Sequence, residues 1–375
     1  MARKLILLAT GGTGGHVFPA QALAEALGRR GWQLALITDD RGERYSGVLG
    51  ALETHRISAA GVSGKGALAR VKALVKLGLG YFQARRLIRQ LDPAVVVGFG
   101  GYPSVPTMLA ASSLKRRTVI HEQNAVLGRA NRLLAPRMGS IAISFDHVAM
   151  LKPADMARAV VTGNPIRPDI AVLAGEEYVL PGPMERFRLL CVGGSQGAQI
   201  FGEVVPAAIA ALTEAQRARL AIALQVKPDQ VEPVKARFAS MGVEADVRAF
   251  FDDIPALLRG AHLVIARAGA STTAELAAAG RPSILVPYPH AIDDHQSANA
   301  ARLCDAGGGW MIPQPDLSVP VLARRLGQLM DATGQLARVA AAARHVGIPQ
   351  AGRNLADLVE AVAEGRTPER EGEAP

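Results

Sequence analysis

Short apolar runs recur along the chain, and each is followed by a glycine-rich or polar loop and then by a stretch with helical spacing. In the first half these runs predict buried strands at residues 4–9, 33–38, 94–98, 118–121 and 140–144, with a helix at 19–30. Strands that alternate with helices in this way form βαβ units. The pattern therefore predicts a parallel sheet that is covered on both faces.

The same order of strand, glycine loop and helix begins again at residue 188. Strands are predicted at residues 188–192, 221–226, 262–266 and 283–286, with a helix at 203–212. We expect an α/β protein with a first domain at 1–164 and a second at 165–344, joined by a hinge near residues 162–168. A helix at about 345–364 is expected to pack back on the first domain, and residues 365–375 are expected to form a disordered tail.

Length and cysteine usage agree with this organisation. A chain of 375 residues is too long for one ordinary core. No apolar run reaches the roughly 20 residues of a membrane helix, and the apolar N-terminal run leads straight into a glycine loop, which favours a first strand over a signal peptide. Cys191 and Cys304 form no disulfide framework, so a reduced, cytoplasmic protein is expected.

The net charge of +9 is unevenly distributed. Residues 1–164 carry +13 and the remainder −4, and the only acidic residue between Thr54 and His121 is Asp92. Such a basic half indicates an anionic partner: nucleic acid, anionic lipid or a phosphorylated substrate. Aromatic residues make up only 4% of the chain, which leaves few platforms for base stacking and argues against nucleic acid.

The basic residues gather in a predicted helix at residues 67–91. Its apolar positions roughly follow one helix face: Leu68, Val71, Val75, Leu79 and Phe82. Its basic positions are interleaved with them: Lys72, Lys76, Arg85, Arg86 and Arg89. Either the helix packs on the sheet and its lysines are solvated, or the helix presents a surface to anionic lipid.

A first candidate site is the glycine loop of residues 11–15, which is followed by His16. Glycines let the backbone approach a ligand closely, and the helix N-terminus after the loop favours anions. The spacing fits neither a dinucleotide fingerprint, whose third glycine would fall at Val17, nor a P-loop. His16 would lie at the carboxyl edge of the sheet, where an imidazole can act as a base; otherwise it is structural.

A second candidate site follows the strand at 118–121 and consists of His121, Glu122, Gln123 and Asn124. Four polar side chains at a strand end are costly unless they are paired or used. They are interpreted either as functional groups or as a hydrogen-bonded network that braces the first glycine loop.

Two further loops belong to the second half. Residues 193–198 repeat the glycine loop, and Ser195 offers a hydroxyl to a phosphate. Residues 267–282 place small residues at a helix start, which suits a diphosphate, and Glu275 could accept hydrogen bonds from two ribose hydroxyls. Thr272 and Glu275 also have capping-box spacing, and the alternative is that Glu275 caps the helix. His290, Asp293 and Asp294 have poor spacing for a metal, and no metal site is expected.

Taken together, the motifs resemble those of the MurG family, which transfers N-acetylglucosamine from UDP-GlcNAc to undecaprenyl-diphosphoryl-MurNAc-pentapeptide (lipid I) in peptidoglycan synthesis. The matching segments are GGTGGHVFPA, GFGGYPSVP, HEQNAVLGRANRLLA, TGNPIR, GGSQGA, residues 270–275 with AAAGRPSILVPYPH, and DDHQSANA. The resemblance implies an α/β fold of the GT-B type, with two Rossmann-like domains whose parallel sheets face a central cleft. It also implies inversion at the anomeric carbon through an oxocarbenium-like transition state.

The resemblance implies site residues and partners as well. The UDP-GlcNAc contacts would be Thr13, Gly14, Gly15, Asn124, Arg167, Ser195, Phe251, Ala270, Ser271, Thr272, Thr273, Ala274, Glu275 and Gln296, with Phe251 acting through its backbone. His16 would be the general base, with Glu122 as the competing candidate. No cofactor, metal or nucleic acid is expected. Lipid I would be the acceptor, and the basic first domain would contact anionic lipid at the cytoplasmic face of the inner membrane.

Three other functions remain open from the residues. A diacylglycerol glucosyltransferase would use the same fold with another acceptor. A sugar-nucleotide 2-epimerase would need acidic groups for chemistry at C2 and no basic lipid-facing half. A binding module without catalysis is compatible with the basic half alone, but the paired glycine loops fit a cleft enzyme better.

Overall fold

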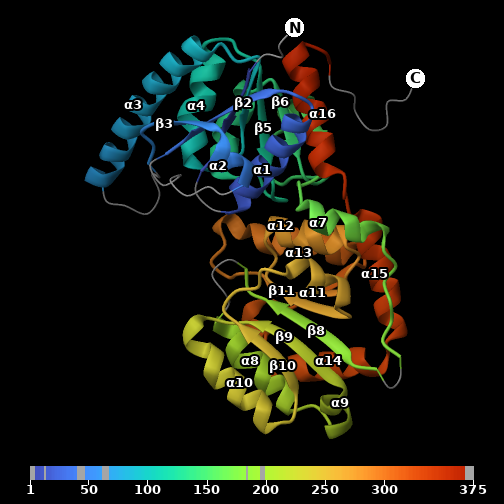
Figure 1. The fold of residues 1–375 in the computed structure, drawn as a ribbon. Helices are drawn as coiled ribbons and strands as arrows, with labels where there is room; N and C mark the ends of the chain where they lie inside the picture. Colours follow the sequence, from blue (N-terminus) through green and yellow to red (C-terminus); the bar gives the residue numbers. More distant parts are fainter. Residues whose placement is uncertain are drawn as a thin grey trace. The chain divides into compact units, whose positions relative to one another are not determined.

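The computed structural model describes residues 5–11, 14–39, 47–60, 67–182, 185–194 and 199–367, and of residues 67–69 it describes the backbone alone. The chain divides into two compact units (Figure 1). Unit 1 comprises Met1–Ile166 and Gln350–Pro375, and unit 2 comprises Arg167–Pro349. Each unit is a parallel sheet with helices on both faces, so the predicted fold class of two Rossmann-like domains is confirmed.

In unit 1 the described strands form a seven-stranded sheet in the order β3-β2-β1-β4-β5-β6-β7, in which every pairing is parallel. The strands are β1 Leu5–Ala9, β2 Gln33–Thr38, β3 Glu53–Arg56, β4 Val95–Gly98, β5 Thr118–Glu122, β6 Ser140–Ile143 and β7 Ala159–Val161. The α-helices are α1 Gly14–Arg29, α2 Gly47–Ala51, α3 Ala67–Leu91, α4 Gly101–Ser113, α5 Arg129–Leu134, α6 Pro153–Met156 and α16 Ala351–Glu364.

Two hydrophobic clusters cover the two faces of this sheet. One packs α3, α4 and α5 against it, and the other packs α1 and α16 (Figure 1). The inner strands are buried along most of their length because a parallel sheet with helices on both sides has no solvated face, whereas the edge strands β3 and β7 are partly exposed. This layering leaves the carboxyl edge of the sheet, where the loops after the strands lie, as the place for chemistry.

Helix α16 completes unit 1 from the far end of the chain. Leu355 and Val359 are fully buried in the cluster that α1 also joins. The Glu360 carboxylate accepts a hydrogen bond from the Trp32 indole at 2.5 Å and forms an ion pair with Arg30. The helix is thus fixed to α1 and β2 by both packing and charge.

In unit 2 the described strands form a six-stranded parallel sheet in the order β10-β9-β8-β11-β12-β13. The strands are β8 Phe187–Val192, β9 Leu220–Gln225, β10 Glu244–Arg248, β11 Leu263–Ala266, β12 Ser283–Leu285 and β13 Gly309–Met311. The α-helices are α7 Pro168–Ala171, α8 Gln199–Ala210, α9 Glu214–Arg219, α10 Val231–Ser240, α11 Ile254–Gly260, α12 Ala270–Ala278, α13 His295–Asp305, α14 Val319–Asp331 and α15 Gly334–Val346. Helices α8, α10 and α14 pack on one face, while α11, α12 and α13 lie on the other (Figure 1).

All nine strands predicted from apolar runs are confirmed within a few residues. The sequence missed β3, β7, β10 and β13, which are the edge strands of the two sheets. The edge strands β3 and β10 consist largely of polar and charged residues, and β7 and β13 are only three residues long, which is too short for a pattern to show.

Two helix predictions need correction. Helix α1 begins at Gly14, not at residue 19, and Pro19 lies inside it as its sixth residue. As a result, His16 lies in the first helical turn. Helix α8 likewise begins at Gln199, before the predicted residue 203.

Helix α3 packs on the sheet with a different face from the one that the apolar pattern indicated. The buried positions are Ala73, Gly80, Ala84 and Ile88. A Cβ on Gly80 would lie 1.9 Å from the backbone oxygen of Ser58, so the close packing requires glycine. The predicted apolar positions Val71, Val75, Leu79 and Phe82 are instead exposed, so the helix packs on the sheet through other residues than these.

Within the part of the chain that the structure describes, no helix is long and apolar enough to cross a bilayer. Residues 368–375 of the expected tail lie outside the described residues.

Candidate active site

The His16 side chain lies beside two glycines of the loop after β4, Gly100 and Gly101. Gly14 and Gly15 form the start of α1, and the His16 backbone oxygen accepts a hydrogen bond from the Thr10 hydroxyl at 3.0 Å. The imidazole lies against Gly100, where an added Cβ would be 3.1 Å from Cδ2 and 3.3 Å from Nε2. Gly100 and Gly101 also have positive φ angles of 83° and 70°, which favour glycine. The loop after β4 is therefore shaped around the His16 ring.

The Glu122 carboxylate is enclosed by donors from its own loop. Oε1 accepts from the backbone N–H and the side chain of Asn124 at 3.0 and 3.2 Å. Oε2 accepts from the Gly128 N–H at 2.8 Å and from the Asn131 side chain at 2.9 Å. Burial raises the pKa of Glu122, and these four donors oppose that rise. Glu122 and Asn124 are thus joined in a network that fixes the loop after β5.

A second buried network begins at His121. Its Nδ1 accepts from the Gln123 side chain at 3.1 Å, and its Nε2 lies 3.3 Å from the Gly163 oxygen, which requires the Nε2–H tautomer. The Gln123 side chain also donates to the Phe99 oxygen at 2.9 Å. Burial lowers the pKa of His121 to about 4, so this ring stays neutral at physiological pH. It acts as a structural link between the ends of β4, β5 and β7.

In unit 2, the start of α12 contains residues 270–275. Gly269 is the N-cap residue and has no side chain to cap the first N–H groups, while the Thr273 hydroxyl donates to the Gly269 oxygen at 3.1 Å. The first N–H groups of a helix have no partner within the helix, so they remain available to an anion. Ala270, Thr273 and Glu275 are buried, whereas Ser271, Thr272 and Ala274 are partly exposed. The capping box proposed for Thr272 and Glu275 is wrong, because the helix starts two residues before Thr272.

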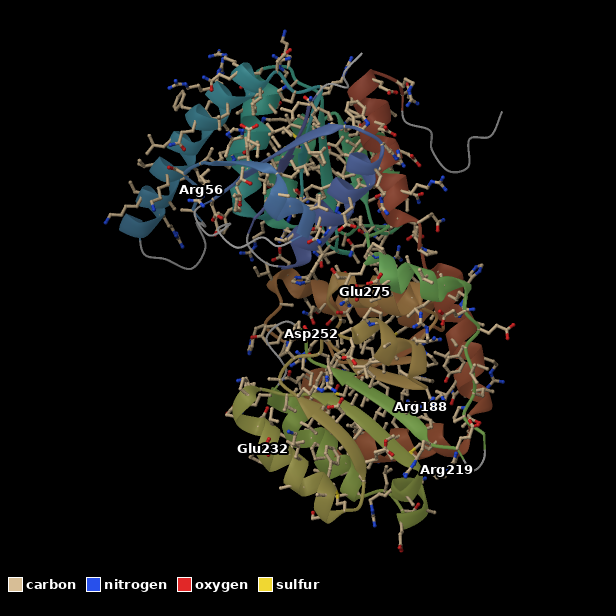
Figure 2. All side chains as sticks on the ribbon, in the orientation of Figure 1. Arg56, Arg188, Arg219, Glu232, Asp252 and Glu275 are labelled. Carbon is tan, nitrogen blue, oxygen red and sulfur yellow. The ribbon has the colours of Figure 1, made fainter. Side chains whose placement is uncertain are left out.

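Glu275 pairs with Arg167 instead. The Arg167 guanidinium donates to both carboxylate oxygens at 2.8 Å, in the bidentate geometry that these groups favour. Burial lowers the pKa of Arg167, but the hydrogen bond to Glu275 and the charges of Glu275 and Asp169 together outweigh burial, so the pKa is raised. Both residues were predicted from the family resemblance, and the structure brings them together at α12, where Figure 2 marks Glu275.

The remaining predicted donor contacts lie at the carboxyl edge of the second sheet or outside the described residues. Phe251 follows β10, and its buried side chain lies under the Arg248 guanidinium, whose Cζ is 5.3 Å from the ring centroid. Gly193 and Gly194 follow β8. Thr13 and Ser195 are outside the described residues. The structure thus anchors Phe251 in this loop through its buried ring.

Gln296 fixes the loop after β12. Its side-chain oxygen accepts from the Tyr288 N–H at 2.9 Å. Arg267 donates to the oxygens of Val286 and Pro287 at 3.1 Å and stacks over Tyr288. The sequence placed Arg267 in the motif at residues 267–282 but gave it no role. In the structure Arg267 holds the loop after β12 through these contacts.

Among the described residues, no group of three or more His, Cys, Asp and Glu side chains has the arrangement of a metal site. The sequence did not indicate three residues that hold the site in place. Gly100 lies beside His16, Asn131 donates to Glu122, and the side chain of Gln225 bonds to the backbone of Gly193 and Ala249. The doubled glycine at 100–101 was a signal for Gly100, whereas nothing in the local pattern marked Asn131 or Gln225.

Comparison with known proteins identifies the family. The N-terminal domain of glycosyltransferase family 28 matches residues 6–143, and the C-terminal domain of the same family matches residues 188–359. A UDP-N-acetylglucosamine–N-acetylmuramyl-(pentapeptide) pyrophosphoryl-undecaprenol N-acetylglucosamine transferase of Rhodospirillum rubrum is 56% identical over 97% of this chain and 93% of its own length. The chain belongs to this family of glycosyltransferases.

Other members of the family agree. The transferase of Mesorhizobium japonicum is 49% identical over 98% of this chain and 97% of its own length. The crystal structure of MurG from Acinetobacter baumannii has a TM-score of 0.77 and 30% identity, and the match covers 95% of this chain and 99% of that one. The resemblance to the MurG family is therefore confirmed. A UDP-N-acetylglucosamine 2-epimerase structure from Listeria monocytogenes, with a TM-score of 0.67 and 14% identity, shows the shared fold alone.

Proposed function

We propose that this protein transfers N-acetylglucosamine from UDP-GlcNAc to the C4 hydroxyl of MurNAc in lipid I, which gives lipid II for peptidoglycan synthesis. The observation that carries this proposal is the 56% identity, over 97% of the chain, to a transferase named for that donor sugar and acceptor. The local geometry of both units supports it, because one contains an imidazole in a shaped loop and the other an anion-binding helix start beside a carboxylate.

Unit 2 binds the donor. The N–H groups at the start of α12 donate hydrogen bonds to the diphosphate, as does the Ser195 hydroxyl. The backbone at Phe251 recognises the uracil. Glu275 accepts hydrogen bonds from the ribose hydroxyls, and Arg167 holds its carboxylate in place by two hydrogen bonds at 2.8 Å. Gln296 of unit 2 contributes to binding of the sugar and its phosphates, and unit 1 adds Asn124, Thr13, Gly14 and Gly15.

Unit 1 supplies the base. The acceptor O4 attacks the anomeric carbon as the bond from that carbon to the UDP oxygen breaks, and UDP leaves with the electron pair, so the configuration inverts. His16 takes the proton from the attacking hydroxyl, a contribution typically worth about a hundred- to ten-thousand-fold in rate. Glu122 is unsuited to this role because four hydrogen bonds already occupy its two oxygens. Negative charge on the departing UDP is stabilised by the helix N-terminus, without a cofactor.

Unit 1 also binds the membrane. The exposed side chains of α3 include Val71, Leu74, Val75, Leu79 and Phe82. Four basic residues of α3 are exposed among them: Lys72, Lys76, Arg86 and Arg89. Arg85 instead donates hydrogen bonds to the hydroxyls of Tyr81 on α3 and Ser113 on α4. An apolar helix face flanked by cations suits the interface of an anionic bilayer. The protein is thereby a peripheral enzyme of the cytoplasmic face of the inner membrane, and nucleic acid is not a partner.

A panel of donors and acceptors tests this function against its rivals. The purified protein is incubated with UDP-GlcNAc or UDP-glucose, each with a lipid I analogue, with diacylglycerol or alone. We expect UDP release only with UDP-GlcNAc and the lipid I analogue. Glucosyl-diacylglycerol would indicate the lipid glucosyltransferase, and UDP-N-acetylmannosamine formed without acceptor would indicate the 2-epimerase.

A further inference from the structure

Gln225 is a buried carboxamide that joins two loops at the carboxyl edge of the second sheet. It is the last residue of β9, the strand between β8 and β10, and its exposed fraction is 6%. Its Oε1 accepts from the Gly193 N–H at 3.2 Å, and its Nε2 donates to the Ala249 oxygen at 3.2 Å. One side chain thus reaches the first loop residue after each neighbouring strand.

The carboxamide continues the sheet beyond the end of its backbone pairing. The register ends with Arg248 opposite Gln225 on one side and Cys191 opposite Leu224 on the other. A peptide group in a strand would offer one donor and one acceptor to its two neighbours, and the Gln225 side chain does the same. The starts of the two loops are therefore held at the spacing of the sheet.

These two loops meet different parts of the donor. Gly193 begins the glycine loop of the diphosphate, and Ala249 precedes Phe251, whose backbone meets the uracil. Phe251 is anchored by its buried ring under Arg248. Figure 2 shows Asp252, just after this loop, at the far end of β8 from Arg188, in agreement with a position at the carboxyl edge.

We propose that Gln225 is a positioning residue for the donor, whose carboxamide sets the separation of the uracil-binding and diphosphate-binding loops so that both parts of UDP bind at once. This inference rests on the proposed function. Two subsites on one ligand reinforce each other only when their spacing matches the ligand. Loss of the bridge should therefore cost affinity for UDP much more than affinity for uridine, which uses one loop.

The test compares uridine, UMP and UDP binding to the wild type and two variants by isothermal titration calorimetry. Gln225→Met keeps the length of the side chain and removes both hydrogen bonds. Gln225→Glu keeps an acceptor for Gly193 but places an oxygen against the Ala249 oxygen. We expect Gln225→Met to weaken UDP by about tenfold and uridine by less than about twofold, as expected when one bridging interaction is lost. Gln225→Glu should show the same pattern, and it serves if the Met variant does not fold.

Tyr178→Phe is the matched control. The Tyr178 hydroxyl donates to the His262 oxygen at 2.7 Å, a partly buried hydrogen bond in the same unit but at the amino end of β11. Its loss should lower stability and leave the ratio of UDP to uridine affinity unchanged. Steady-state rates add a second criterion, since a positioning role raises KM for UDP-GlcNAc in the Gln225 variants while kcat stays within about threefold.

Equal weakening of uridine and UDP in a folded Gln225 variant, or no weakening of either, would overturn this inference. A wild-type protein that binds neither UDP nor uridine would instead contradict the proposed donor site. The two failures are therefore distinguishable.

Discussion

At the residue scale, the position of the His16 side chain depends on the absence of a Cβ atom at Gly100. An added Cβ would lie 3.1 Å from the imidazole Cδ2, and the backbone there has a φ of 83°. The sequence placed His16 at a loop mouth and the structure places it in the first turn of α1. Sequence reasoning could identify the histidine by its motif, but not the glycine from a distant segment that shapes its surroundings.

Replacement of His16 by Ala should reduce kcat by about a hundred- to ten-thousand-fold and leave the Kd for UDP-GlcNAc nearly unchanged. The reason is that a base acts on the acceptor hydroxyl and not on bound donor. Single-turnover kinetics with a lipid I analogue and donor titration measure the two effects. Gly100→Ala should reduce kcat in the same direction by displacing the ring. Unchanged turnover of His16→Ala would contradict the role of His16 as the base.

We expect the Glu275 carboxylate to accept hydrogen bonds from the ribose hydroxyls. Its carboxylate is not a helix cap, and its pairing with Arg167 leaves further acceptor capacity on both oxygens. We expect Glu275→Gln to weaken UDP by roughly tenfold or more, as for loss of a hydrogen bond to a charged group. The preference of the wild type for UDP over 2′-deoxy-UDP should shrink in parallel. If both nucleotides weaken by the same factor, Glu275 serves only to hold Arg167.

His121 should make unit 1 sensitive to acid. Its pKa is about 4 in the folded protein and 6.5 ordinarily, so the unfolded chain binds more protons between these values. The free energy of unfolding should therefore fall as pH drops from about 6.5 toward 4, by up to about 3 kcal/mol from this residue. Urea unfolding at several pH values should show a smaller decline for His121→Gln, which can keep both hydrogen bonds. His262, whose pKa burial also lowers to about 4, titrates equally in both proteins. An identical decline in the variant would contradict this role.

At the scale of elements, α3 shows where apolar pattern alone misleads. The pattern found a helix and an apolar face, but it could not tell a core face from an exposed one. The side that packs contains Ala73, Gly80 and Ala84, because small residues allow close approach to the backbone at Ser58. The larger apolar side chains remain exposed, with Phe82 at 68% and Leu79 at 54%.

We expect the double variant Leu79→Glu, Phe82→Glu to bind vesicles that contain phosphatidylglycerol at least about tenfold more weakly, because it removes apolar area and adds repulsive charge. Co-sedimentation measures the binding. Turnover with a short-chain, soluble acceptor should stay the same. Val321→Glu on α14, another exposed apolar position, is the matched control and should bind vesicles normally. Unchanged vesicle binding by the double variant would exclude α3 as the membrane surface.

The strands show a related limit. Every central strand was predictable because two sheet faces and two strand neighbours demand apolar residues. The edge strand β10 reads Glu-Ala-Asp-Val-Arg and β3 reads Glu-Thr-His-Arg, so charge on their open sides hides the periodicity. The Gln225 bridge was equally hidden, because it depends on β10 lying beside β9.

At the scale of the whole molecule, the two units have the same arrangement of secondary structure. Each unit has a parallel sheet whose first strand leads into a glycine loop and a helix, and each has its own hydrophobic clusters. The charge is divided as well, because unit 1 (residues 1–166 and 350–375) carries a net +10 and unit 2 (residues 167–349) carries −1. Such a division suits an enzyme that meets a lipid-linked acceptor with one unit and a soluble nucleotide sugar with the other.

The most direct measurement is the structure of the product that the purified protein makes from UDP-GlcNAc and a lipid I analogue. NMR of the isolated product reports both the linkage position and the anomeric configuration. We predict one UDP released for each disaccharide formed, with GlcNAc joined through a β bond to the C4 oxygen of MurNAc. An α-linked product, attachment at another hydroxyl, or no disaccharide from folded protein would contradict inverting transfer to lipid I.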